Sequence, residues 1–179
     1  IVLDPVGAGA TSQRTAAAVE LIELCRPTII RGNASEIMTV ASAWSKHSGS
    51  SEQDCEESAK SKGVDSSASS DDAVHAAIRL AQQTGAVVVI SGATDYITDG
   101  KVIHTVEGGD EIMTTVTGMG CTATALTGAF AAVCKDPMTA AVAAMAVMSA
   151  AGEKAAAQAR GNGSMQMHFL DELYNLTEL

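Results

Sequence analysis

Short apolar segments alternate with longer stretches of helical periodicity along most of this chain, and this alternation most constrains what it can fold into. Strands are predicted over residues 1–3, 28–31 and 86–91, followed by a hairpin over 95–106 that turns at Asp99-Gly100. Helices are predicted over residues 12–24, 33–43, 71–83, 121–134, 138–159 and 164–176. Strands that alternate with helices predict an α/β fold with a mainly parallel sheet, and in such sheets ligands bind beyond the carboxyl ends of the strands.

Composition limits the classes of protein to which the chain can belong. A length of 179 residues, 46% of them hydrophobic, favours one domain with one substantial core. The formal charge of −10 and the lack of any Lys and Arg run argue against a nucleic-acid or anionic-membrane partner. The longest apolar stretch, residues 138–151, is shorter than the roughly 20 residues of a membrane span.

The cysteines indicate a reducing compartment. They show neither the paired spacing of a metal site nor the framework of a secreted protein, and they stand at Cys25, Cys55, Cys121 and Cys134. A cytoplasmic location is therefore expected.

Two features bear on domain organisation. Residues 45–70 are dominated by Ser, Lys, Glu and Asp and have little to bury, which predicts a serine-rich surface insertion. The chain opens directly on an apolar segment, Ile1-Val2-Leu3, with no initiator methionine. Residue 1 is therefore interpreted as lying inside a larger protein.

The segment Thr117-Gly118-Met119-Gly120-Cys121 precedes a run of small residues that reads as a helix. Two glycines separated by one residue allow a tight turn, and a helix N-terminus carries about half a positive charge. Together they predict an anion hole built from Gly118, Met119, Gly120 and Cys121. The alternative is an ordinary loop-to-helix turn in which Cys121 is a small buried residue.

Several polar residues are expected at one edge of the sheet. Asp4 follows the first strand, Arg31 ends the second, and Ser91 ends the third, while Glu36 lies one helical turn beyond Asn33. Because the carboxyl ends of parallel strands meet at one edge, these side chains should lie near one another. The alternative is a local Arg31–Glu36 salt bridge, with Asp4 capping a turn.

Five segments carry a resemblance to a known family. They are Leu3-Asp4-Pro5-Val6, Ile30-Arg31-Gly32-Asn33-Ala34-Ser35-Glu36, the segment 92–100, the segment 116–121, and Asp171-Glu172-Leu173-Tyr174-Asn175-Leu176. In this order they resemble the hydroxyethylthiazole kinase family of the ribokinase-like superfamily, across nearly the whole chain apart from the insertion. Other kinases of that superfamily usually carry Asp where Cys121 stands. The resemblance implies a three-layer α/β/α fold, with residues 1–179 forming the C-terminal major part of one kinase domain whose N-terminal portion is absent.

The resemblance also implies a reaction, transfer of the ATP γ-phosphoryl group to the hydroxyl of 4-methyl-5-(2-hydroxyethyl)thiazole, in thiamine biosynthesis or salvage. It implies the following roles: Mg²⁺ ligands Asp4 and Glu36, ATP contacts Arg31 and Ser91 (where the family usually has Thr), a thiazole contact Gly118, and a catalytic Cys121 beside the hydroxyl. These roles suit the chemistry, because phosphoryl transfer depends on positioning and charge neutralisation. The positive end of a helix also favours a thiolate that accepts the hydroxyl proton.

Two other functions stay open at this point. One is a different ribokinase-like kinase that acts on a hydroxymethylpyrimidine or a sugar, and the other is a non-catalytic ligand-binding relative. The family resemblance further implies a homotrimer with active sites at subunit boundaries, which agrees with the abundance of small apolar residues between 122 and 159.

Overall fold

The computed structural model describes residues 1–49 and 66–177, the first five residues of the second range by backbone alone. Its elements, in chain order, are β1 (Val2–Leu3), α1 (Ser12–Cys25), β2 (Ile29–Asn33), α2 (Ala34–His47), α3 (Ser66–Thr84), β3 (Val87–Ser91), β4 (Thr94–Thr98), β5 (Ile103–Glu107), the 3₁₀ helix η1 (Glu111–Thr115), α4 (Met119–Val133), α5 (Pro137–Ala156) and α6 (Asn162–Asn175). Every predicted strand and helix has a counterpart, and η1 is an addition that the sequence pattern did not predict.

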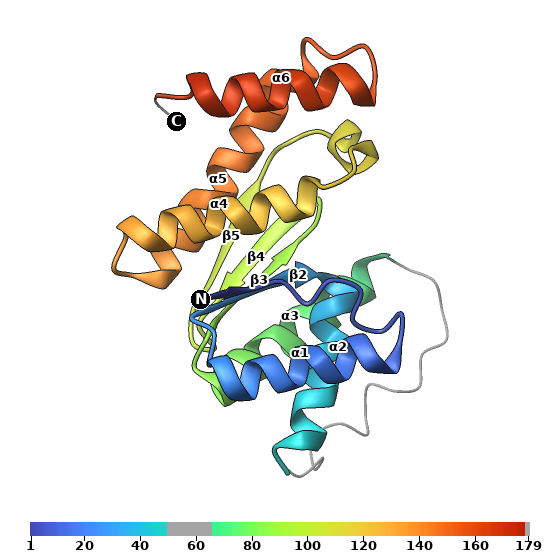
Figure 1. Ribbon diagram of the computed structural model, residues 1–179, viewed down its shortest axis with the longest axis vertical. Helices are drawn as coiled ribbons and strands as arrows, with labels where there is room; N and C mark the ends of the chain where they lie inside the picture. The colour runs from blue at the N-terminus through green and yellow to red at the C-terminus, as the bar shows by residue number, and fades with distance from the viewer. Residues whose placement is uncertain (50–65, 178–179) are drawn as a thin grey trace.

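The molecule has three layers, with α1, α2 and α3 on one side of the sheet and α4, α5 and α6 on the other (Figure 1). The strand order is β1-β2-β3-β4-β5. β1, β2 and β3 run parallel, but β4 and β5 are antiparallel to their neighbours, so the described sheet is mixed rather than mainly parallel. The two residues between β3 and β4 are too few for the crossover that a parallel pair requires.

The strands bury both of their faces. In β2, Ile29 packs against the α4–α6 layer and Ile30 against the α1–α3 layer, and β3 repeats this alternation from Val87 to Ile90. Successive side chains of a strand point to opposite faces of the sheet. A continuous apolar strand therefore contributes to the hydrophobic core on each side of the sheet. The prediction of a fully buried strand over 86–91 is confirmed up to Ile90, and Ser91 is half-buried at the end.

Polar side chains cap the first two helices at their N-termini. Thr11 caps α1 by accepting a hydrogen bond from the Arg14 amide, and Asn33 caps α2 in a reciprocal capping box with Glu36. α4 starts at Met119 rather than at Cys121, since Gly118 has a φ of 88° and occupies the N-cap position. Met119, Gly120 and Cys121 therefore form the first helical turn.

The predicted insertion over residues 45–70 falls mostly outside the described residues. At its ends the helices extend further than the sequence pattern indicated, because α2 continues to His47 and α3 begins at Ser66. Ser45 lies on α2 and donates a hydrogen bond to the side chain of Gln83 on α3. Of the helices in the described part of the chain, none has the length and apolar character needed to cross a membrane.

Candidate active site

Three polar side chains from neighbouring strands face the α4–α6 layer at one edge of the sheet. Arg31 lies two residues after Ile29, which packs against that layer, and Asp95 lies two residues before Ile97, which packs there too. The same alternation along β3 places Ser91 on this face, two residues after Val89. Strand periodicity thus brings a guanidinium, a hydroxyl and a carboxylate together beneath the N-terminus of α4.

Arg31 is the centre of this group, and only 8% of the residue is exposed. Its Nη2 donates a hydrogen bond of 2.5 Å to Ser91 Oγ, and its Nη1 donates one of 3.1 Å to the carbonyl of Gly120. Nη1 also lies 3.7 Å from Asp4 Oδ2, which makes an ion pair rather than a hydrogen bond. Nε is buried and has no hydrogen-bond partner among the described residues, so one donor of the guanidinium is left unsatisfied.

Asp4 is held from the helix side of the site. Thr124 on α4 donates a hydrogen bond of 2.6 Å to Asp4 Oδ2, and Oδ1 accepts no hydrogen bond from the described residues. The side chain of Asp4 is 13% exposed. The alternative prediction of a local Arg31–Glu36 salt bridge is wrong, because the ion pair of Arg31 is with Asp4.

Glu36 lies at the same edge but is engaged with backbone amides. Its Oε1 accepts a hydrogen bond of 2.8 Å from Gly7, in the loop after β1, and its Oε2 accepts one of 3.0 Å from Asn33. Glu36 therefore joins the start of α2 to the loop that follows Asp4. Within residues 1–49 and 66–177, no three His, Cys, Asp or Glu side chains lie together as a metal centre.

The first turn of α4 contains the residues of the predicted anion hole. Gly118 provides no side-chain cap, and the Met119 amide donates to the Val116 carbonyl at 3.4 Å, so the amides of Gly120 and Cys121 keep their donors for another partner. A Cβ at Gly120 would lie 3.1 Å from Arg31 Nη1, so a side chain there would displace the guanidinium slightly from the helix. Cys121 is exposed, so the alternative of a buried space-filling cysteine is wrong.

A cavity of about 540 Å³ opens beside Arg31, between the ends of β3 and β5, the start of β4, η1, α4 and α5. Its volume is within the usual range for small-ligand sites. Four methionines form much of its apolar wall: Met113, Met119, Met145 and Met148. Its polar lining includes Arg31, Ser91, Gly92, Asp95, Asp110, Glu111 and Ser149.

Asp95 is a site residue that the sequence-based prediction did not assign. Burial raises its pKa, while a hydrogen bond of 3.0 Å from the Gly92 amide and the charge of Arg31 counteract part of this shift. The available signal was strand periodicity, because counting back by two from the apolar Ile97 puts Asp95 on the same face as Arg31. The carboxylate therefore gives the cavity a negative group opposite the guanidinium.

We expect Asp95→Asn to stabilise the protein near neutral pH. A raised pKa means that the contribution of Asp95 to stability is complete at low pH and is lost as the pH rises through that pKa. The gain should therefore shrink as the pH falls, which thermal unfolding across a pH series measures. Asp99→Asn, at the hairpin turn, is the matched control. Backbone hydrogen bonds lower the pKa of Asp99, so this substitution should reduce stability near neutral pH, and the loss should shrink as the pH falls. A gain for Asp95→Asn that does not depend on pH would contradict this explanation.

Comparison with solved structures places this fold in a known class. The structure of a hydroxyethylthiazole kinase protein from Pyrococcus horikoshii superposes with a TM-score of 0.81 at 32% identity, covering 99% of this chain and 60% of the other. The pyridoxal kinase from Staphylococcus aureus in complex with AMP-PCP gives a TM-score of 0.59 at 22% identity, covering 86% of this chain and 52% of the other, and shows the fold alone. The fold is that of the ribokinase-like small-molecule kinases.

The sequence comparisons then identify the family. The model of the hydroxyethylthiazole kinase family matches residues 1–179, and the chain belongs to that family. Hydroxyethylthiazole kinases from Leptospira biflexa and Syntrophus aciditrophicus are 50% and 51% identical over 98% and 99% of this chain. The chain spans 61% of the length of each of these two relatives.

Proposed function

We propose that the protein containing this chain transfers the γ-phosphoryl group of ATP to the hydroxyl of 4-methyl-5-(2-hydroxyethyl)thiazole, in thiamine biosynthesis or salvage. The observation that carries the proposal is a buried arginine whose hydrogen bonds go to neutral oxygens, beside the uncapped first turn of a helix and a ligand-sized cavity. The N-terminus of a helix favours an anion, and a guanidinium beside it can hold a phosphate by hydrogen bonds. The family match supplies the identity of the phosphate acceptor.

ATP is proposed to bind with its phosphates at Arg31 and Ser91 and its base toward the methionine-lined part of the cavity. A guanidinium can hold a phosphate through two parallel hydrogen bonds, and Ser91 is already hydrogen-bonded to Nη2. Methionine side chains adapt to the shape of a flat apolar group. Of the four predicted anion-hole residues, Gly118, Gly120 and Cys121 would add amide donors for the negative charge on the transferred group, since the Met119 amide donates to the Val116 carbonyl.

Asp4 and Glu36 are proposed to help bind Mg²⁺ together with water and the ATP phosphates. Mg²⁺ in nucleotide sites is commonly held by one or two carboxylates plus phosphate, so a full set of protein ligands is not required. Asp4 fits this role because its Oδ1 accepts no hydrogen bond from the described residues. Each oxygen of Glu36 accepts one backbone hydrogen bond and retains a lone pair for a metal-bound water. When bound, Mg²⁺ would neutralise charge on the phosphate oxygens.

Cys121 is proposed as the group that takes the proton of the substrate alcohol, and Gly118 as a contact of the thiazole ring. The alcohol oxygen forms a bond to the γ-phosphorus while the bond from that phosphorus to the bridging oxygen of ADP breaks. The hydroxyl proton passes to the sulfur of Cys121, which acts as a thiolate and becomes a thiol. The exposure of Cys121 supports this role, because a substrate must reach the thiol.

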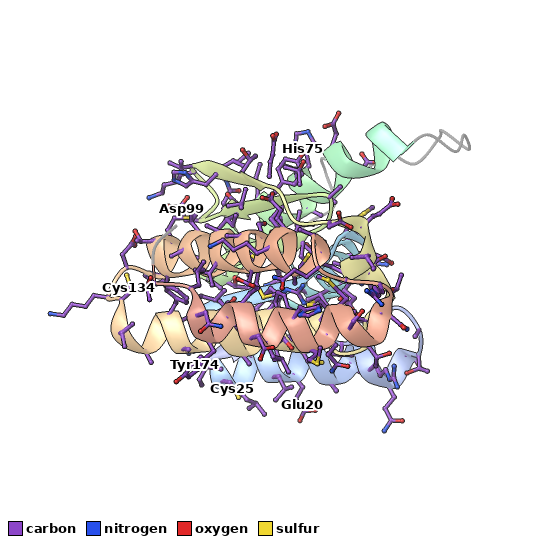
Figure 2. All side chains as sticks on the ribbon, turned by 90° about the horizontal axis from the view of Figure 1, so that it is seen from above. Glu20, Cys25, His75, Asp99, Cys134 and Tyr174 are labelled. Carbon is purple, nitrogen blue, oxygen red and sulfur yellow. The ribbon has the colours of Figure 1, made fainter. Side chains whose placement is uncertain are left out.

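The full-length protein is further proposed to be a cytoplasmic homotrimer with active sites at its subunit boundaries. Exposed apolar side chains on α4 and α6 support an assembly; they include Val133, Leu170 and Tyr174. In Figure 2, Tyr174 lies at the periphery of the molecule on α6. Light scattering tests this proposal, and we expect the full-length protein to have the mass of three subunits.

ADP release by the full-length protein tests the proposed function. We expect release from ATP and MgCl₂ to depend on the thiazole alcohol, measured by a coupled assay. Hydroxymethylpyrimidine and ribose serve as competing acceptors in parallel reactions. Release with one of these alone would assign a different kinase activity of the same fold. No release with any acceptor would favour a non-catalytic ligand-binding protein.

A further inference from the structure

One threonine of α4 differs from the other threonines of that helix. The hydroxyls of Thr122 and Thr127 donate only to carbonyls four residues earlier, at 3.1 and 2.8 Å, as threonines in helices commonly do. Thr124 has such a carbonyl, that of Gly120, at 3.3 Å, but its contact with Asp4 Oδ2 is shorter, at 2.6 Å. A hydroxyl has one proton, and a close carboxylate is the stronger acceptor. Thr124 therefore donates to Asp4.

The hydroxyl of Thr124 shares both of its acceptors with Arg31. Nη1 of Arg31 lies 3.1 Å from the carbonyl of Gly120 and 3.7 Å from Asp4 Oδ2. Because 3.7 Å is too long for a hydrogen bond, the Thr124 hydroxyl makes the hydrogen bond that orients the Asp4 carboxylate, and Arg31 adds charge. With Oδ2 held in this way, Oδ1 is the oxygen that stays available, since no described residue donates a hydrogen bond to it.

We propose that Thr124 is a positioning residue for phosphoryl transfer, which fixes the Asp4 carboxylate so that Oδ1 is available to Mg²⁺ or its waters. The proposal rests on the proposed function, in which Asp4 helps hold the metal. When ATP phosphates compete for Arg31, the bond from Thr124 keeps Asp4 in place, because it depends on α4 and not on the guanidinium. The site thereby separates two tasks, since Arg31 binds phosphate while Thr124 orients the carboxylate.

Thr124→Val tests the proposal because valine has the shape of threonine without its hydroxyl. Thr127→Val, which removes a hydroxyl bonded only within α4, is the matched control, and Thr124→Ser should restore the bond. All variants are made in the full-length protein. Binding of Mn²⁺ in the presence of ADP is measured by electron paramagnetic resonance, and binding of ADP in EDTA by calorimetry. Loss of a hydrogen bond to a ligating group typically weakens metal binding about 10-fold or more.

We expect Thr124→Val to weaken Mn²⁺ binding and lower turnover about 10-fold each, with ADP binding in EDTA close to that of the wild type. Thr124→Ser and Thr127→Val should bind Mn²⁺ like the wild type. Unchanged Mn²⁺ binding in Thr124→Val would overturn the proposal, as would an equal loss in Thr127→Val or an equal loss of metal-free ADP binding. Thr124→Ala carries the same test if the valine variant does not fold.

Failure of the proposed function gives a different result. If the wild type releases no ADP with the thiazole alcohol but Thr124→Val still loses Mn²⁺ binding, the assigned reaction is wrong and the positioning role stands. If the wild type phosphorylates the alcohol and the variant binds Mn²⁺ normally, the reaction stands and the positioning role is wrong.

Discussion

Cys121→Ala in the full-length protein is expected to lower turnover about 100-fold or more, with ATP binding largely retained. The substitution removes the thiol proposed to accept the substrate proton but leaves the first turn of α4 in place, since alanine is a good helix former. The alcohol then loses its proton without the acceptor that we propose for it. Steady-state kinetics with the thiazole alcohol as the varied substrate, together with nucleotide binding by calorimetry, measures both effects.

Cys25→Ala is the matched control, because Cys25 is also an exposed free cysteine and lies at the end of α1, at the periphery of the molecule (Figure 2). It should have wild-type turnover. Alkylation in a Cys25→Ala background should inactivate the enzyme, and the thiazole alcohol should slow that inactivation. If Cys121→Ala retains wild-type turnover, the thiol is not the proton acceptor, and catalysis depends on positioning and charge neutralisation alone.

Much of the fold was predictable because its signals are local. An apolar run such as 86–91 is read directly as a buried strand, and Asn33 with Glu36 marks a helix start through the spacing of a capping box. The meeting of Asp4, Arg31 and Ser91 was also predictable, since each follows or ends a strand at one edge of the sheet. These predictions need only the periodicity of each element and the rule that ligands bind at that edge.

Other parts of the site depend on contacts between distant segments. The hydrogen bond from Thr124 to Asp4 joins residues far apart in the chain, and no periodicity within α4 distinguishes Thr124 from Thr127. The methionine wall of the cavity is assembled from η1, α4 and α5, and η1 carries too weak a local pattern to be predicted. The sheet is mixed because the short β3–β4 connection makes β4 antiparallel to β3. The predicted hairpin alone did not show this, since it does not say which strand lies beside β4.

Arg31→Ala is expected to lower kcat/KM for ATP by roughly 10- to 150-fold, which corresponds to loss of a hydrogen-bonded charged contact of about 1.5–3 kcal/mol. The substitution removes the phosphate-binding group and also leaves Ser91 Oγ and the Gly120 carbonyl without the hydrogen bonds that the guanidinium donates. Stability should fall as well, since the chain loses a buried side chain that joins β2, β3 and α4. Nucleotide binding and thermal unfolding are therefore measured together.

Arg31→Lys separates the loss of charge from the loss of geometry. A lysine ammonium retains the positive charge but lacks the planar fork that contacts Ser91 and Gly120 from two nitrogens, so its kcat/KM should fall between those of alanine and the wild type. Arg79→Ala, at an exposed position on α3, controls for the loss of a positive charge elsewhere. If Arg31→Ala unfolds at a lower temperature but binds ATP with wild-type affinity, Arg31 connects the elements of the site and does not bind phosphate. If the lysine variant equals the wild type, the charge alone suffices, and the two hydrogen bonds to neutral oxygens serve folding.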